Sequence, residues 1–160
     1  MVPDNYKIVN ILNKTATAAG TELSGYVDTK GYDYLVLNAI NICTVAASPL
    51  TGLRVREDDT VPTAFTDMTA IVKFTGAAAT STSAGFVLPG NNSVVDNIHQ
   101  FNIDLRGRKR YIGLDMVPTT SGWCSCAALL FRGCNGKNHP VNTSADATTV
   151  ASQLRLVVNG

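Results

Sequence analysis

Hydrophobic and polar residues alternate along most of the chain. In GLRVRE, residues 52–57, the alternation places Leu53 and Val55 on one side of a strand and Arg54 and Arg56 on the other, because successive side chains of a strand point to opposite faces. The same period of two predicts strands at 6–12, 24–28, 32–40, 52–57, 68–74, 84–88, 99–105, 110–117, 125–131 and 152–158.

Turn-rich segments separate these strands at intervals of roughly 8–12 residues, a spacing typical of an all-β sandwich or barrel. The pattern lacks the alternating helices that a parallel α/β sheet requires. Helix is expected only within 141–154, where Ser144 or Asp146 could cap a short turn. The small polar residues at 75–85 predict a loop too short to link two domains, so residues 1–160 are expected to form a single β-sandwich domain.

The composition indicates a weakly charged surface. Charged residues make up 16% of the chain, against about 25% in ordinary soluble domains, and the formal net charge is +1. This balance lacks the basic footprint of a nucleic-acid-binding protein and suits a surface covered by protein neighbours. No apolar run is long enough to span a bilayer, and MVPDNYKIVN lacks the plan of a signal peptide. We therefore expect a soluble protein made in a cytoplasm, with no membrane and no nucleic acid as partner.

The cysteines are Cys43, Cys124, Cys126 and Cys134, and without a secretion signal they are expected to be reduced and partly buried. On a strand, Cys124 and Cys126 share one face. Together with Cys134 and His139 they could supply four zinc ligands, but the CSC spacing differs from that of structural zinc sites, which favours small core residues. A disulfide between Cys43 and Cys134 stays open. We expect no metal and no cofactor.

Candidate catalytic groups are few. The acidic turn REDDT contains Glu57, Asp58 and Asp59; it lacks the spaced oxygens and central glycine of an EF-hand, so a solvated turn or a salt-bridge partner for a basic neighbour is favoured. The two histidines, His99 and His139, lie in no nucleophile, P-loop or dinucleotide motif. The sequence therefore predicts that the protein is not an enzyme.

A basic cluster, RGRKR at 106–110, follows the strand at 99–105. Gly107 in front of a renewed alternation predicts a hairpin turn. A nucleic-acid site needs aromatic residues interleaved with cations over a broad basic face, whereas only Tyr111 is close. Arginine also pairs with carboxylates across protein interfaces, so protein contact is favoured over nucleic acid. The predicted contact residues of the cluster are Arg106, Arg108, Lys109 and Arg110.

Three segments resemble the capsid decoration, or cement, proteins of tailed phages. GYVDTKGYDYLVLNAINI (25–42) is similar to their opening pair of strands, with a glycine before a conspicuously apolar strand. GLRVREDDTVPTAFTDMTAI (52–71) is similar to their segment of a strand, an acidic turn and small and aromatic residues. FNIDLRGRKRYIGLDMVPTTSGWCSCAALLF (101–131) is similar to their late hairpin, in which an Arg-Tyr pair opens a strand and the next strand is rich in alanine.

This resemblance implies a single-domain, jelly-roll-like antiparallel sandwich of roughly 8–10 short strands. It also implies a structural component of the virion, which binds the outer surface of the head and stabilises its lattice. The partners would then be the major capsid protein and other copies of this chain, with a homotrimer expected at threefold positions.

Two regions are then expected to form the capsid or subunit interface. Residues 1–22 could form a partly extended arm, in which Tyr6, Ile8 and Val9 pair with a neighbour; an ordinary first strand of the sandwich is the alternative. The RGRKR cluster is expected to contact acidic residues of a neighbour, such as an adjacent subunit's REDDT turn. The acidic contact residues are Glu57, Asp58 and Asp59.

Two other functions stay open. A carbohydrate-binding jelly roll in a head fibre or host-recognition component would stack sugar rings on aromatic side chains; the candidates are Tyr32, Tyr34, Tyr111 and Trp123. A small enzyme of cupin type would need metal-binding histidines clustered on neighbouring strands, which two histidines far apart in the sequence favour poorly.

Overall fold

A computed structural model describes residues 6–43, 50–71, 96–132 and 153–158. The described part is almost entirely β, apart from one turn of 3-10 helix, η1 (Phe65–Asp67). The strands are β1 (Tyr6–Thr17), β2 (Leu23–Asp28), β3 (Tyr34–Cys43), β4 (Leu50–Asp58), β5 (Thr69–Ala70), β6 (Asp96–Asp104), β7 (Tyr111–Pro118), β8 (Gly122–Phe131) and β9 (Gln153–Val158).

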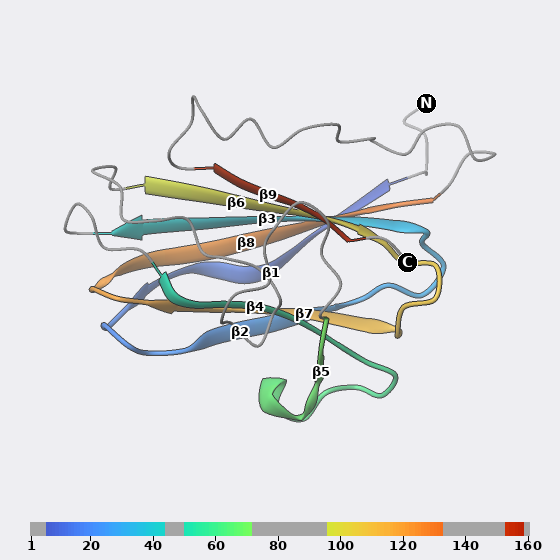
Figure 1. Cartoon of the computed structure of the whole chain (residues 1–160), viewed down its shortest axis with the longest axis horizontal. Helices are drawn as coiled ribbons and strands as arrows, with labels where there is room; N and C mark the ends of the chain where they lie inside the picture. The colour runs from blue at the N-terminus through green and yellow to red at the C-terminus, as the bar shows by residue number, and fades with distance from the viewer. Residues whose placement is uncertain (1–5, 44–49, 72–95, 133–152, 159–160) are drawn as a thin grey trace.

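The strands form two sheets packed face to face (Figure 1). One sheet has the order β1-β8-β3-β6-β9 and the other has the order β2-β7-β4-β5. Strand β1 pairs with β8, β2 with β7, β3 with β6 and β4 with β5, all antiparallel. The first four strands thus pair with the next four in reverse order, which is the wrapping of a jelly roll. The expected all-β, jelly-roll-like sandwich is confirmed.

One pairing differs from the predicted antiparallel arrangement. Strand β9 lies beside β6 and runs parallel to it, from Ile98 opposite Gln153 to Ile103 opposite Val158. The two strands are far apart in sequence, and only a tight hairpin forces neighbouring strands to run in opposite directions. Alternation along each strand carries no information on this choice.

The core lies between the sheets, where alternate residues of each strand meet. Leu53 and Val55 are fully buried, whereas Arg54 and Arg56 lie on the outer side of β4, as the alternation predicted. The largest fully buried side chains are Leu35, Leu37, Leu53, Ile71, Phe101, Ile103, Ile112, Leu114, Met116 and Leu130. Their burial supplies the main stabilising term of the fold, at roughly 25 cal/mol per Å² of apolar surface.

The segment 106–110 does not form the predicted hairpin. Strand β6 belongs to the five-stranded sheet and β7 to the four-stranded sheet, so the segment crosses from one sheet to the other. Gly107 still supplies the turn, with a φ of 78°, and the Arg108 N–H donates to the Leu105 carbonyl at 3.0 Å. The prediction was wrong because a hairpin and a crossing corner both need a turn followed by renewed alternation.

The predicted N-terminal arm is an integral strand over Tyr6–Thr17. Strand β1 pairs with β8 from Tyr6 opposite Phe131 to Thr17 opposite Gly122. Within the described residues it forms one edge of the five-stranded sheet, so its second edge has no strand beside it there. The alternative of an ordinary first strand therefore describes these residues, and residues 1–5 lie outside the described part.

Several predicted elements fall elsewhere. Of the strand at 68–74, the structure describes Thr69–Ala70 as strand β5. The strand at 84–88, the loop at 75–85 and the helical turn within 141–154 lie largely or wholly outside the described residues. In the part of the chain that is described, no helix is long and apolar enough to cross a membrane.

Candidate functional site

The segment 106–110, here called the basic corner, lies at one end of the sandwich beside the turn between β2 and β3. The Thr29 N–H and hydroxyl both donate to the Arg110 carbonyl, at 2.9 and 2.7 Å. Arg110 donates to Asp28 from Nε at 3.0 Å and from Nη2 at 2.6 Å. Its guanidinium also lies over the Tyr111 ring, 5.0 Å from the centroid. Arg110 is thus occupied by groups of its own chain.

The other cations of the basic corner also have partners within the chain. Arg106 pairs with Asp104 at the end of β6. Arg108 Nη1 lies 3.7 Å from Glu57 Oε1, and the Lys109 backbone N–H donates to Glu57 Oε2 at 3.3 Å. The Lys109 ammonium donates to Thr69 Oγ1 at 3.1 Å. The pairing that was expected between RGRKR and a neighbour's REDDT turn therefore exists inside one molecule, through Glu57.

The carboxylates at this end are held in their charged form. The paired Arg110 lowers the pKa of Asp28 to about 2. Asp58 Oδ1 accepts from the Thr60 N–H and hydroxyl, both at 3.0 Å, and these bonds lower the pKa of Asp58. The REDDT turn is thus a turn closed by its own side chain. Among the described residues, no three His, Cys, Asp or Glu side chains gather as metal ligands would.

The outer side of the five-stranded sheet is apolar, and we call it the apolar sheet face. Seven large hydrophobic side chains are exposed among the described residues, and five of them lie on this face. They are Tyr6 and Ile8 on β1, Ile40 on β3, Ile98 on β6 and Trp123 on β8. Ile8 is the most exposed, at 61%.

The strand register places these side chains together. Tyr6 and Ile8 lie opposite Phe131 and Leu129 of β8, which in turn lie opposite residues of β3. Directly opposite residues of an antiparallel pair share one face of the sheet. Two of the predicted interface residues, Tyr6 and Ile8, are thus exposed on the apolar sheet face. Val9, the third predicted residue of this strand, is partly buried and packs against the core.

The apolar sheet face has two apolar patches with a polar row between them. Ile40 lies opposite both Ile98 and Ser125, and this second patch continues to Trp123. Between the patches, Asn10, Ala127, Asn38 and Gln100 form one row across four strands. Gln100 Nε2 donates to Asn38 Oδ1 at 2.9 Å.

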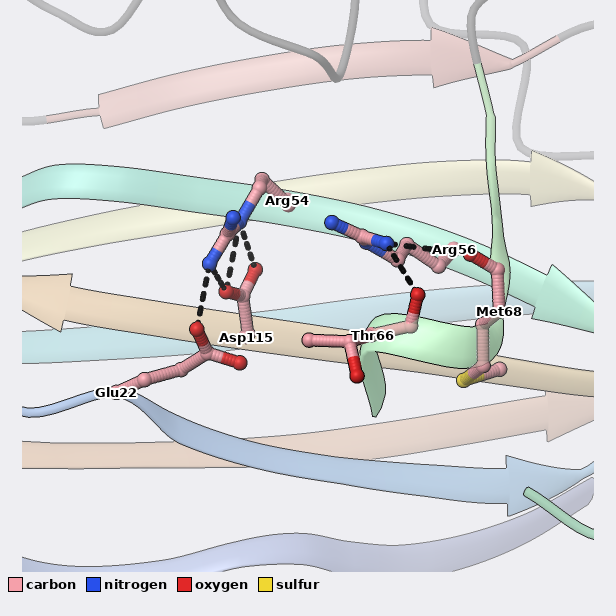
Figure 2. Close-up of polar contacts among 6 residues, drawn as sticks. All are labelled: Glu22, Arg54, Arg56, Thr66, Met68 and Asp115. Carbon is pink, nitrogen blue, oxygen red and sulfur yellow. Dashed lines mark hydrogen bonds and ion pairs between the residues drawn. The ribbon is translucent and has the colours of Figure 1, made fainter. Parts of the chain in front are cut away.

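The opposite outer face, on the four-stranded sheet, is charged (Figure 2). Arg54 on β4 donates to both oxygens of Asp115 on β7, and from Nη2 to Glu22 Oε2 at 2.8 Å. Asp115 is fully buried beneath this contact; burial raises the pKa of Asp115, while the paired Arg54 opposes that rise. Next to it, Arg56 Nη1 donates to the carbonyls of Thr66 and Met68, both at 3.2 Å. Arg54 thus links β4 to β7, and Arg56 links β4 to the η1–β5 segment.

Sequence reasoning missed this network and part of the apolar sheet face. Asp115 interrupts the apolar strand RYIGLDM, and a lone acid there is a signal for a cation on a neighbouring strand. For the apolar sheet face the signal lies in YLVL at 34–37, whose residues are apolar on both sides of the strand, as in strands covered on both faces.

The buried histidine and thiols lie on the inner side of the five-stranded sheet. His99 is buried without a described hydrogen-bond partner on either ring nitrogen, and burial lowers its pKa to about 4. Cys124 and Cys126 are buried, form no disulfide within the described residues and share the core face, as predicted. Burial raises the pKa of Cys126 to about 12, so it is a core residue rather than a nucleophile. The other candidate zinc ligands, Cys134 and His139, lie outside the described residues.

The four aromatic residues considered for sugar stacking do not form one platform. Tyr34 and Trp123 lie on the apolar sheet face at opposite ends of β3, since Tyr34 is opposite Phe131 and Ile42 is opposite Trp123. Tyr111 is buried on the other sheet and meets Tyr26 edge-on at 5.9 Å. Tyr32 packs against the core, with Arg132 over its ring.

The chain was compared with known proteins at the level of family, sequence and structure. It matches no protein-family model, no curated protein and no solved structure.

Proposed function

We propose that this chain is a non-enzymatic structural protein of a tailed-phage virion, which binds the outer surface of the capsid and stabilises the head lattice. Its partners in this proposal are the major capsid protein and other copies of the chain, arranged as a homotrimer at threefold positions. The protein is made in the host cytoplasm and ends on the outside of the head.

The observation that carries the proposal is the apolar sheet face. Monomeric proteins scatter single hydrophobic side chains over their surface, whereas a concentration of them marks a contact with another molecule. Five of the seven exposed large hydrophobic residues of the described part lie on one sheet face. A rigid jelly roll with such a face suits a protein whose task is to hold other proteins together.

The charges of the described residues support protein contact over nucleic acid. Binding a phosphate backbone requires cations that are available to replace counterions. Here Arg106, Arg108 and Arg110 already face Asp104, Glu57 and Asp28. The four aromatic residues considered for sugar stacking are dispersed over two sheets and the β2–β3 turn, which likewise favours protein contact over the carbohydrate alternative.

The test is co-sedimentation with capsids prepared without this protein, from a tailed phage whose genome carries its gene. The proposal predicts saturable binding, with a fixed number of copies per capsomer, and heads that resist heating better once saturated. Capsids already saturated with unlabelled protein are the control. Absence of binding, combined with specific binding to a glycan array, would replace the proposal by the carbohydrate-binding alternative.

A further inference from the structure

The proposed function calls for contacts with sister copies and with the capsid, and the two outer faces of the sandwich differ enough to divide these roles. The apolar sheet face carries exposed hydrophobic residues, whereas the opposite face carries Arg54, Arg56 and Asp115. We propose that copies of this chain associate with one another through the apolar sheet face. This inference rests on the proposed function and names the surface that the sister copies share.

The charge pattern of the apolar sheet face favours a second copy as its occupant. Along residues 6–10 of β1 and strands β8, β3 and β6, the one charged residue on this face whose side chain the structure describes is Asp104, at the end of β6. Asp104 is already matched by Arg106. Identical copies bring identical charges, so a face with an uncharged centre lets them approach without like-charge repulsion.

The polar row of the apolar sheet face also favours a second copy of the chain as its partner. Asn10, Asn38 and Gln100 cross the middle of the face. A side-chain amide has both a donor and an acceptor, so amides of one copy can pair with amides of another. The described side chains of β1, β8, β3 and β6 on this face include no cation of the kind that a phosphate-rich partner, such as nucleic acid or a membrane surface, would require. The amide row borders both apolar patches, so uncharged polar groups lie at the rim of either contact.

The size of the face sets how much surface each copy contributes to the assembly. Four strands about 4.8 Å apart, each of about nine residues at about 3.3 Å, cover roughly 19 by 30 Å. That projected area of roughly 570 Å² underestimates the accessible surface, because side chains roughen it, and a standard specific interface uses about 800 Å² per partner. In a ring this area is divided between two neighbours, so each single contact is smaller than a standard interface, and the trimer gains stability because the contact is repeated three times.

The arrangement of the patches also fits a ring. One patch contains Tyr6 and Ile8, and the other contains Ile40, Ile98 and Trp123. In a closed trimer each subunit presents two different patches, one to each neighbour. Ile8 belongs to the first patch and lies on the edge strand β1, so it reaches a neighbour with least obstruction.

The experiment is light scattering coupled to size-exclusion chromatography on the full chain, from about 10 to about 200 μM. The single variants Ile8→Glu and Ile98→Glu each place a charge in one patch. Val61→Glu is the matched control, since Val61 lies outside the sheets and is 59% exposed, close to the 61% of Ile8. Circular dichroism and urea unfolding establish that every variant is folded.

The inference predicts a wild-type mass near three times the 16.9 kDa chain mass. Each patch variant should weaken association at least about 30-fold and shift the mass toward one chain, as loss of a central interface residue does. Val61→Glu should keep the wild-type mass. A wild-type monomer over the whole range, or patch variants that associate like wild type, would overturn it. Binding to capsids is measured separately, so failure here is distinguishable from failure of the proposed function.

Discussion

Arg54 and Asp115 form a two-pronged ion pair across β4 and β7, in which the Arg54 Nε lies 3.0 Å from Oδ1 and 2.7 Å from Oδ2 of the carboxylate. Asp115 has no exposed side-chain surface, whereas the third member, Glu22, is 36% exposed. The pair therefore differs from most ion pairs of the surface, because one of its charges is fully buried and Arg54 is its hydrogen-bonded counter-charge.

Replacing Arg54 by alanine should lower the free energy of unfolding by about 3 kcal/mol, because it leaves the Asp115 carboxylate buried without a counter-charge. Glu22→Ala is the control and should cost less than about 1 kcal/mol, as an exposed partner does. Urea unfolding of both variants measures the difference. Equal losses for the two would mean that Asp115 does not depend on Arg54.

Two arginines of the basic corner differ in burial and can be compared by mutation. Arg108 has 11% of its side chain exposed and faces a Glu57 side chain of 14%, whereas Arg106 is 67% exposed. Arg108→Ala should reduce stability by about 1–2 kcal/mol, since it removes the cation beside a largely buried carboxylate. Arg106→Ala should change it by less than about 0.5 kcal/mol. A larger loss at Arg106 would contradict this assignment.

Gly25 shows how closely β2 approaches β1. A Cβ built on Gly25 would lie 2.1 Å from the Ile11 carbonyl oxygen, so the backbone itself would have to move. Gly25→Ala should therefore cost more than about 2 kcal/mol, or prevent folding. Gly20→Ala is the comparison, because Gly20 has a φ of 74° with open space around it, and only the backbone strain of about 1–2 kcal/mol applies there. Thermal unfolding of both variants is the measurement.

His99 should make stability depend on pH in a defined window. Its pKa is about 4 in the folded protein against an ordinary 6.5, so between these values the unfolded chain binds a proton that the folded protein excludes. Stability should fall as the pH drops from about 6.5 to about 4, by on the order of 3 kcal/mol in total.

The variant His99→Leu isolates this contribution. Unfolding is measured for wild type and variant between about pH 7.5 and about pH 4.5, and the difference between the two curves should grow toward low pH. Asp115, whose pKa burial raises, acts with the opposite sign in wild type and variant alike, so it cancels in the difference. The paired Asp28 titrates below this window. A difference that stays constant with pH would show that His99 binds its proton as readily in the folded protein as in the unfolded chain.

Local alternation was sufficient to find most strands, because each strand buries one side. The clearest case is β4, where the alternation correctly predicted that Leu53 and Val55 are buried and that the two arginines beside them face outward. Which strands pair with one another could not be predicted from the local pattern of residues. Arg54 and Asp115 are 61 residues apart, and only the jelly-roll wrapping brings β4 beside β7. For the same reason the partner of Arg108 proved to be Glu57 of its own chain.

The same distinction between local pattern and strand pairing applies to the predicted interface residues. Tyr6 and Ile8 are exposed, in keeping with a contact role, whereas the alternation of β1 turns Val9 toward the core. Ile98 joins them through the register of β6 with β3 and β8 with β1, which no single segment reveals. A surface assembled from four strands becomes visible only once the sheet order is known.

The most direct test of the central claim is a cryo-electron microscopy difference map between capsids with and without the purified protein. The account predicts added density outside the shell, centred on threefold or quasi-threefold positions of the lattice, into which copies of the jelly roll fit with the apolar sheet faces turned toward one another. Capsids that show no added density, or density confined to the inside of the shell or to the tail, would contradict it.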